Sequence, residues 1–461
     1  MSLPDLKLLS HEQKDALIVE LFKRLQALEH RVAANSANSH RPPSTDGLSK
    51  PAPKSLRKSG QRPNGGQLGH AGATLSQVAQ ADVVIEHGRL QQCPSCSAAF
   101  GAAEVVARRQ VIDLKPSELQ VTEHRMLRAV CACGHVHEGM WPEGVGASVQ
   151  YGPNIKAQAV ALSQQHLVPL ARVCEIMRAS FGVSLSQASV LEFNAQAAQA
   201  LKTTVQRIGK ALQSQPVVHA DESGIRIQGK LAWLHCAVTD QYSWLAQHAK
   251  RGKAAFEQLG ILPGVRGVLV HDGLASYKEL ECTHSLCNAH HLRELVAAHE
   301  HDQAFDDWAQ RAQDLLVQAN EQVKLVGAPL SEAAQASYMR SWHELLAQGL
   351  LFNRENTEPN TRGRPKQSKS FNLIRRLREH TDDVWRFTRE PGVPFTNNLA
   401  EQALRMCKVK QKVSGCFRTQ QGANTFFTIR SYLGTMKKQG ADLMQCLHSA
   451  FTPNPIQPKF A

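Results

Sequence analysis

The sequence lacks any uninterrupted apolar run near the ~20 residues that a bilayer-crossing helix needs. Its first residues also lack the layout of a signal peptide. These two absences argue against a membrane protein and predict a cytoplasmic one. The chain further lacks an even, regularly spaced set of cysteines. Its 11 cysteines include four that are paired closely in one region and others that are scattered, which fits reduced thiols and a bound metal better than disulfides.

Acidic residues are in short supply relative to basic ones. The chain has 53 Lys and Arg against 40 Asp and Glu, so its formal net charge is +13. A surplus of this size favours a polyanionic partner, with nucleic acid as the leading candidate and a merely basic soluble enzyme as the alternative. At 461 residues the chain is too long for one ordinary core, and we expect roughly three modules with their linkers.

The first segment, residues 1–34, carries apolar residues at the a/d spacing of a leucine-zipper-like coiled coil. They are Ile18, Leu21, Leu25, Leu28 and Val32. Self-association through this helix and packing of an amphipathic helix on its own protein are both open. Residues 35–72 are rich in Ser, Pro, Gly, Asn and basic side chains and poor in apolar ones, which predicts a disordered basic linker.

Residues 80–147 contain two close cysteine pairs that predict a zinc-binding domain. The pairs are Cys93 with Cys96, in a Cys-x-x-Cys turn, and Cys131 with Cys133, in a Cys-x-Cys turn. Zinc binds thiolates tetrahedrally, so two such turns supply a closed structural site for Zn²⁺. The second spacing departs from the commonest one, so His135 or His137 is an alternative to one of its cysteines.

Residues 150–212 have helical periodicity that breaks near Gly182 and restarts at Ser184. This pattern predicts a helix, a turn and a second helix. Such a helix-turn-helix region can place its second helix against DNA, but helical hairpins also pack without any DNA contact, and both interpretations are open.

Two apolar runs are each followed by an aspartate, Asp221 after the first and Asp272 after the second. Both runs predict buried strands with the carboxylate near the tip. Between them the pattern predicts strands at 231–238 and 242–247 and a helix at 254–259. This order is the start of a ribonuclease H-like fold, in which the first and fourth strands lie side by side and bring their carboxylates together. The alternative is that both aspartates only cap turns.

Two aspartates at adjacent strand ends suit Mg²⁺ or Mn²⁺, because hard cations prefer carboxylate oxygens and two such ions stabilise both oxygens of an in-line displacement. A later helix supplies a third acid, Glu401, with Thr396 or Asn397 as its cap. The alternative is a surface helix with an i,i+4 pair between Glu401 and Arg405. Residues on and after this helix are predicted to contact DNA: Asn397, Asn398, Arg405, Lys408, Lys410, Lys412 and Arg418.

The stretch between Asp272 and Glu401 is far longer than one connecting helix requires, which predicts a helical insertion at about 292–380. A basic loop near its end, with Arg362 and Arg364, is predicted to lie along DNA. Cys287 and His290 open the insertion at Cys-x-x-His spacing. Two ligands do not make a metal site, so a metal role and a structural or DNA-facing role are both open.

Taken together, the motifs resemble the transposases of the insertion-sequence 66 family over nearly the whole chain. The resemblance is carried by Asn-Ser at 38–39, Pro-Pro-Ser-Thr-Asp-Gly at 42–47, Gly-Gly-Gln-Leu-Gly-His at 65–70, Thr-Leu at 74–75, the four paired cysteines, residues 151–189, Asp-Glu-Ser at 221–223, the strand that leads to Asp272, Cys287-x-x-His290, Asn-Asn-x-Ala-Glu at 397–401 and the stretch from Lys408 to Gly440. Where the family usually has Glu-Thr after the first acid, this chain has Glu-Ser, which keeps an acid and a hydroxyl.

The resemblance implies a bacterial, nucleoid-associated DNA transposase that binds terminal inverted repeats and target DNA. It implies that Asp221, Asp272 and Glu401 are a catalytic Asp-Asp-Glu triad. The implied architecture is multidomain α+β: a coiled coil, a zinc-binding domain and a helix-turn-helix precede a ribonuclease H-like core at 215–430 with its helical insertion, and 431–461 form a C-terminal element and tail. Homo-oligomers and helper proteins of the same element are implied partners. The alternatives are a zinc-dependent DNA-binding regulator, an inactive relic and a housekeeping nuclease.

Overall fold

The computed structural model describes residues 10–33, 35, 77–87, 94–99, 105–112, 119–302, 307–357, 365 and 367–460. The chain divides into two compact units, one formed by Met1–Pro51 with Val121–Ala461 and the other by Ala52–Gln120. It is a mixed α+β protein with a five-stranded mixed sheet and many helices. Within the described ranges, no helix combines the length and the apolar character that a membrane crossing requires.

The N-terminal helix α1 spans His11–Ala33. The five apolar residues at its a/d positions are all exposed, from 53% at Leu25 to 85% at Val32. Exposure of a whole apolar stripe is what an unpaired coiled-coil helix would show. Self-association through this stripe stays a prediction. The basic linker predicted at 35–72 lies outside the described residues apart from Asn35.

The central sheet has the strand order β5-β4-β3-β6-β7. Its strands are β3 (Val217–Ile227), β4 (Lys230–Val238), β5 (Ser243–His248), β6 (Val268–His271) and β7 (Thr283–Leu286), with helix α5 (Lys253–Leu259) between β5 and β6. β4 is antiparallel to both its neighbours, whereas β3, β6 and β7 pair in parallel. The predicted adjacency of the first and fourth strands is therefore observed. The apolar runs form strands because both faces of the sheet are covered, which favours continuous apolar sequence.

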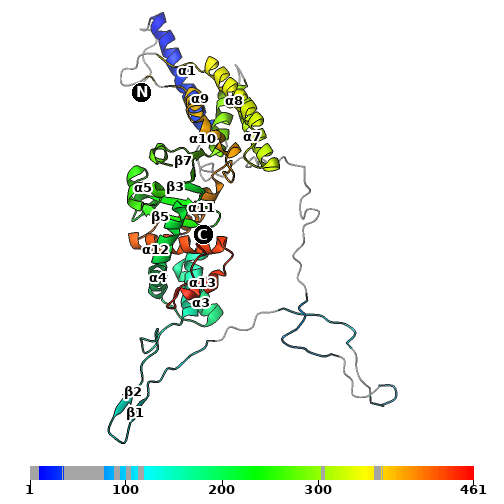
Figure 1. Cartoon of the computed structure of the whole chain (residues 1–461), viewed down its shortest axis with the longest axis vertical. Helices are drawn as coiled ribbons and strands as arrows, with labels where there is room; N and C mark the ends of the chain where they lie inside the picture. The colour runs from blue at the N-terminus through cyan, green and yellow to red at the C-terminus, as the bar shows by residue number, and fades with distance from the viewer. Residues whose placement is uncertain are drawn as a thin grey trace. The chain divides into compact units, whose positions relative to one another are not determined.

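Helices before and after the sheet cover one of its faces and share its core (Figure 1). They are α2 (Pro153–Val160), which continues as a π-helical turn (Ala161–Gln165), α3 (Leu170–Phe181), α4 (Gln187–Gln213) and α12 (Gln420–Lys438). Val190, Leu201 and Ile208 of α4 are buried together with Val218 of β3 and Tyr432 of α12. The region predicted as a helix-turn-helix thus has no core separate from that of the sheet.

The break between α3 and α4 follows from local sequence. Gly182 adopts a left-handed conformation with φ of 67° at the end of α3, which glycine tolerates without strain. The next helix begins slightly later than predicted, because the Ser186 side chain caps it by accepting a hydrogen bond from the Ser189 backbone.

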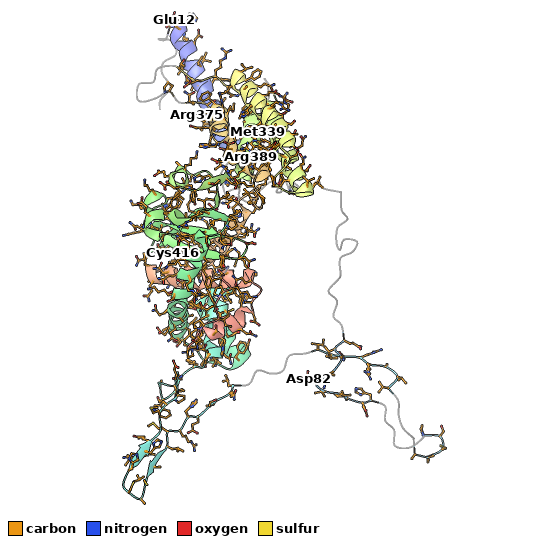
Figure 2. The ribbon with its side chains drawn as sticks, viewed as in Figure 1. Glu12, Asp82, Met339, Arg375, Arg389 and Cys416 are labelled. Carbon is orange, nitrogen blue, oxygen red and sulfur yellow. The ribbon has the colours of Figure 1, made fainter. Side chains whose placement is uncertain are left out.

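Helices between β7 and α11 form most of a second core (Figure 1), which Val268 of β6 and Leu286 of β7 also join. They are α6 (Asn288–Asp302), α7 (Trp308–Val326), α8 (Glu332–Phe352), α9 (Lys369–Glu379) and α10 (Thr381–Trp385), followed by a 3-10 turn (Arg386–Thr388). Trp308, Trp342 and Trp385 are fully buried in it. Figure 2 shows Met339 beside Arg389, whose Nη2 lies 3.1 Å from the Met339 sulfur.

The helical stretch extends past both predicted ends of the insertion, 292 and 380. Asn288, at the start of α6, donates from Nδ2 to the Val384 carbonyl of α10 at 2.9 Å. This buried bond fastens the first helix of the stretch to the last one.

The chain ends with α11 (Asn398–Ser414), α12 and α13 (Leu443–Ser449). α11 packs on the other side of β3 and β4, where Ala400, Leu404 and Cys407 share a core with Leu234 and Cys236. α12 continues through residue 430 without interruption, so a boundary between core and C-terminal element at 430/431 would cut a single buried helix.

Candidate functional site

β3 and β6 bring two of the predicted catalytic acids side by side. Their parallel pairing runs to His219 opposite Val270, and an aspartate follows two residues later on each strand, Asp221 on β3 and Asp272 just after β6. Because the two strands are parallel and the two offsets are equal, both aspartates lie at the same end of the paired segment. One carboxylate oxygen each of Asp221, Asp272 and Glu222 lies within 4.8 Å of the others.

The sequence predicted Asp221 near the tip of its strand, but in the structure Asp221 lies within β3. β3 continues to Ile227, because β4 pairs with it along that length and places Cys236 opposite Asp221. Residues opposite one another share a face of the sheet, and the Cys236 sulfur lies 3.8 Å from the Ala400 carbonyl of α11. Asp221 therefore points toward the helix that carries Glu401.

Glu222 is an acid of this site to which the sequence analysis assigned no role. Its side chain is 0% exposed. Glu222 Oε1 accepts hydrogen bonds from Arg251 Nε at 2.8 Å and Nη2 at 2.7 Å, and Oε2 accepts one from the Tyr277 hydroxyl. Arg251 comes from the loop between β5 and α5, and Tyr277 comes from the 3-10 turn Ala275–Glu279 after β6. Only the Asp-Glu pair itself pointed to a second acid in the sequence.

The acids of this site repel one another in a poorly solvated place. Burial raises the pKa of the Asp221 carboxyl well above its ordinary value, and the charges of Glu222, Asp272 and Glu401 raise it further. Burial and Asp272 also raise the pKa of Glu222, although Tyr277 and Arg251 oppose the shift. Such uncompensated negative charge with all-oxygen donors fits a hard divalent cation. Asp221 and Asp272 are the candidates to hold it, because the Glu222 carboxylate is already engaged by Arg251 and Tyr277.

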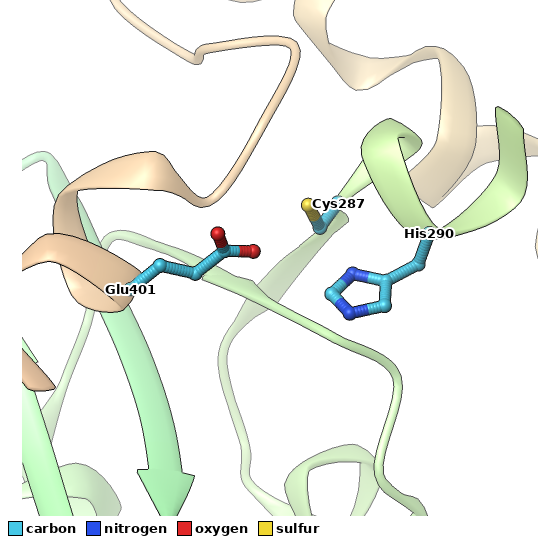
Figure 3. A group of neighbouring side chains, drawn as sticks. All are labelled: Cys287, His290 and Glu401. Carbon is cyan, nitrogen blue, oxygen red and sulfur yellow. The ribbon is translucent and has the colours of Figure 1, made fainter. Parts of the chain in front are cut away.

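The third predicted acid, Glu401, is exposed in the first turn of α11. Its carboxylate points toward Cys287 and His290 (Figure 3), and one ligand atom of each of these three residues lies within 4.8 Å of the others. Among the described residues, Glu401 thus belongs to a different group of possible metal ligands from the two aspartates. It remains near enough to raise the pKa of Asp221.

Asn397, predicted as a DNA contact, is buried with 1% exposure. Its Nδ2 donates to the Ala220 carbonyl at 2.8 Å and its Oδ1 accepts from His219 Nδ1 at 2.9 Å. Its backbone N–H donates to Cys287 Sγ at 3.2 Å. Its polar groups join α11 to β3 inside the protein, and its contact with DNA stays a prediction. It occupies the predicted cap position but makes no side-chain cap bond.

The other predicted DNA contacts differ in accessibility. Asn398, Arg405, Lys412 and Arg418 are exposed and Lys410 is half-buried. Lys408 reaches back over β3, where its Nζ donates to the Gly224 carbonyl at 2.9 Å. Partial burial lowers the pKa of Lys408, and the charge of Asp221 opposes that shift. Arg362 and Arg364 lie outside the described residues.

A pocket of about 470 Å³ opens beside Asp272. Three of its lining residues are cations from separate segments: Arg251 after β5, Lys278 in the 3-10 turn Ala275–Glu279, and Arg376 in α9. Arg376 forms an ion pair with Glu294, another lining residue. Cations next to carboxylates fit a phosphate group that approaches the acids. The pocket was not predictable from sequence, because no local pattern joins these segments.

The predicted zinc ligands are only partly described. Cys93 lies outside the described residues, and Cys96 belongs to the unit Ala52–Gln120. Cys131 and Cys133 are exposed in the turn between β1 (Arg128–Val130) and β2 (Val136–Glu138) of the larger unit. The Cys131 N–H donates to the His135 carbonyl at 2.8 Å, and hydrogen bonds from Cys133 lower the pKa of the Cys131 thiol. The four-cysteine site stays a prediction.

Comparison with known proteins gives the chain its family. The model of the Transposase IS66 family matches residues 148–425, which include both carboxylate strands, the helical insertion and α11. A model described as a family of unknown function (DUF6444) matches residues 1–76. None of the curated proteins matches the chain. The family match covers more than half of the sequence and confirms the resemblance read from its motifs, so this chain belongs to the Transposase IS66 family.

Proposed function

We propose that this transposase cleaves and joins DNA with Asp221, Asp272 and Glu401 as a metal-binding Asp-Asp-Glu set. The observation that carries the proposal is the group of carboxylates at the edge of β3 and β6, where oxygens of Asp221, Glu222 and Asp272 lie within 4.8 Å of one another. Two acids at matched positions of parallel strands are suited to phosphoryl transfer assisted by hard cations.

The sheet supports a ribonuclease H-like core. Its order is β5-β4-β3-β6-β7, and β4 alone runs opposite to the other four strands. This is the continuation of the strand order predicted from the sequence. The helix α5 between β5 and β6 and the position of Asp221 on the first strand agree with the same fold.

In the proposed reaction, water cuts a phosphodiester at a transposon end, and the freed 3′ hydroxyl then attacks target DNA. Mg²⁺ or Mn²⁺, when bound, supplies electrostatic stabilisation of the attacking and leaving oxygens. Asp221 and Asp272 offer carboxylate oxygens, and Glu401 joins them by turning from its observed direction. Glu222 keeps Arg251 beside the pocket, where Arg251 and Lys278 orient the phosphates of the bound strand.

The remaining parts of the proposal concern binding and assembly. The exposed cations of α11 and its continuation, among them Arg405, Lys412 and Arg418, face solvent and suit the DNA backbone. The cysteine turns bind structural Zn²⁺ in a module that helps to recognise terminal repeats. The exposed apolar stripe of α1 joins two copies, so that two transposon ends are held together, and helper proteins of the same element complete the assembly.

The test uses the full-length protein with Mg²⁺ and labelled DNA that carries the sequences flanking its gene on both sides. Wild type is compared with Asp221→Asn, Asp272→Asn and Glu401→Gln. Glu257→Gln, an exposed acid on α5, is the matched control. We expect end cleavage by wild type and control, loss of cleavage in the three variants, and DNA binding by all five proteins.

The alternatives predict different results. A DNA-binding regulator or inactive relic would bind the flanking DNA and never cut it, even after the element's other gene products are added. A housekeeping nuclease would cut without preference for the ends and would not join cut ends to a target. Cleavage that survives in the Glu401→Gln protein would remove Glu401 from the catalytic set.

A further inference from the structure

A second group of metal-ligating side chains lies next to the carboxylate site. Cys287 follows β7, His290 lies in the first turn of α6, and Glu401 lies in the first turn of α11. The Cys-x-x-His spacing left a metal role open, because it offered only two ligands. The fold supplies the third, since a sulfur, a nitrogen and an oxygen of these residues lie within 4.8 Å of one another (Figure 3).

This donor set selects a different metal from the aspartate group. Thiolate and imidazole suit borderline-soft ions such as Zn²⁺, Co²⁺ or Cd²⁺, whereas Mg²⁺ prefers oxygen alone. Tetrahedral bonds of about 2.0 to 2.3 Å to zinc place neighbouring ligand atoms about 3.4 to 3.6 Å apart. The ligand atoms, which lie within 4.8 Å of one another, therefore need to close by at most about 1.4 Å. Glu401, as an exposed side chain, can make its share of this closure by rotation.

Cys287 is held in place for this role by its backbone and its sulfur. Its N–H donates to the His271 carbonyl at 2.9 Å, and its carbonyl accepts from the His290 N–H at 3.1 Å. Its Sγ accepts from the Asn397 N–H at 3.2 Å, a bond that stabilises a metal-bound thiolate. Burial raises the pKa of the Cys287 thiol to about 11, so metal binding releases its proton to solvent.

We propose that Cys287, His290 and Glu401 bind a thiophilic divalent ion such as Zn²⁺, with water as the fourth ligand, and that this ion competes with the catalytic metal for Glu401. The competition rests on the proposed function, in which Glu401 completes the set of Asp221 and Asp272. Occupation by Zn²⁺ holds Glu401 away from the aspartates and suppresses cleavage. By reciprocity, metal at the aspartates weakens Zn²⁺ binding at Cys287 by the same factor.

The binding test uses Co²⁺, whose bond to a thiolate gives an absorption band. It uses full-length protein in which Cys93, Cys96, Cys131 and Cys133 are all replaced by serine, so that both predicted zinc-binding turns are removed. We expect the band to disappear in Cys287→Ser. Loss of a second-shell partner weakens metal binding about 10- to 100-fold, so His290→Asn and Glu401→Gln should weaken it at least about tenfold. The control is Cys282→Ser, which replaces a partly buried thiol outside the group, and it should keep the band.

An unchanged cobalt spectrum in Cys287→Ser would overturn the site. If the buried Cys287→Ser substitution prevents folding, the Co²⁺ affinity of His290→Asn, a change at a half-buried position, is the deciding measurement. An undiminished Co²⁺ affinity in this variant overturns the site, and a tenfold loss of affinity supports it. These readouts need no cleavage, so they stand or fall separately from the proposed function.

The competition is tested by titrating Co²⁺ with and without saturating Mg²⁺. We expect Mg²⁺ to weaken Co²⁺ binding several-fold in the protein with intact aspartates and to have no effect after Asp221→Asn and Asp272→Asn together. Equal weakening in both proteins would overturn the sharing of Glu401 while leaving the soft-metal site in place. In cleavage assays, Zn²⁺ should inhibit the Mg²⁺-supported reaction, and Cys282→Ser should be inhibited as wild type is.

Discussion

Replacing Asp221 by asparagine should stabilise the metal-free protein. Asp221 is a buried acid with Glu222 and Asp272 beside it, and both burial and these neighbours raise its pKa. Asparagine has nearly the same shape and still accepts the hydrogen bond that the Glu222 N–H donates to Oδ1 at 2.8 Å. The substitution therefore removes charge repulsion without removing a contact.

The size of the effect follows from the geometry. Two unit charges 4.8 Å apart, the limit for this group, repel by about 3.5 kcal/mol at an effective dielectric constant of about 20. Arg251 offsets part of this repulsion through its ion pair with Glu222 at 2.7 Å. Uptake of a proton by Asp221 relieves another part. We expect a gain of about 1 to 3 kcal/mol in the free energy of unfolding, and a melting temperature higher by about 1 to 3 °C.

The gain must depend on pH in one direction. Below the ordinary aspartate pKa of about 4, Asp221 is protonated in both folded and unfolded states, so the substitution changes little. As the pH rises from there through the raised pKa of folded Asp221, the wild type loses stability that the variant keeps. The difference between variant and wild type should therefore be small near about pH 4 and larger near about pH 8.

Thermal unfolding followed by circular dichroism at both pH values measures this difference. Glu257→Gln is the control, because this acid is exposed on α5 and its substitution should change little. Mg²⁺ should stabilise wild type more than Asp221→Asn, because the variant lacks one of the two carboxylates. A variant that is less stable than wild type near pH 8, or equally shifted at both pH values, would refute the argument that repulsion dominates this site.

Two further substitutions test how the site is held. Asn397→Leu leaves His219 and a β3 carbonyl without their partner inside the protein. Urea denaturation should therefore show a loss of about 2 kcal/mol or more in the free energy of unfolding. A neutral result would mean that α11 is not anchored there. Gly267→Ala places a Cβ 2.4 Å from the Gln215 and Pro216 carbonyl oxygens, so it should lower the free energy of unfolding by about 3 kcal/mol. As its control, Gly152→Ala places a Cβ that meets nothing within 4 Å, and this variant should melt at the wild-type temperature.

The strands of the site were predictable because their signals are local. Runs of apolar residues before Asp221 and Asp272 give strands that are buried on both faces, and the order of elements gives the adjacency of β3 and β6. What the pattern did not give was the length of β3. Its extension to Ile227 depends on pairing with β4, and the end of a strand is set by its partner and not by its own sequence.

The parts that escaped prediction all depend on contacts between distant segments. Glu222 appeared as the neighbour of a predicted catalytic acid, and nothing in the sequence near it shows that Arg251 and Tyr277 enclose its carboxylate. The amphipathic pattern of α4 showed that one face is buried but not that the partner is the sheet. The burial of Asn397 could not be predicted for the same reason, because a polar residue beside a predicted catalytic acid can face either solvent or another element.

The two groups of ligands are linked through the first turn of α11. Asn397 fixes this turn to β3 through the Ala220 carbonyl and to the second group through Cys287 Sγ, and the Glu401 N–H donates to the Asn397 carbonyl at 3.3 Å. With the backbone held on both sides, Glu401 can pass between the groups only by rotating its side chain. Exposed side chains change rotamer within nanoseconds. The choice between the aspartates and the Cys287 group is therefore an equilibrium set by the affinities and concentrations of the two metals, and a slow change of fold is not required.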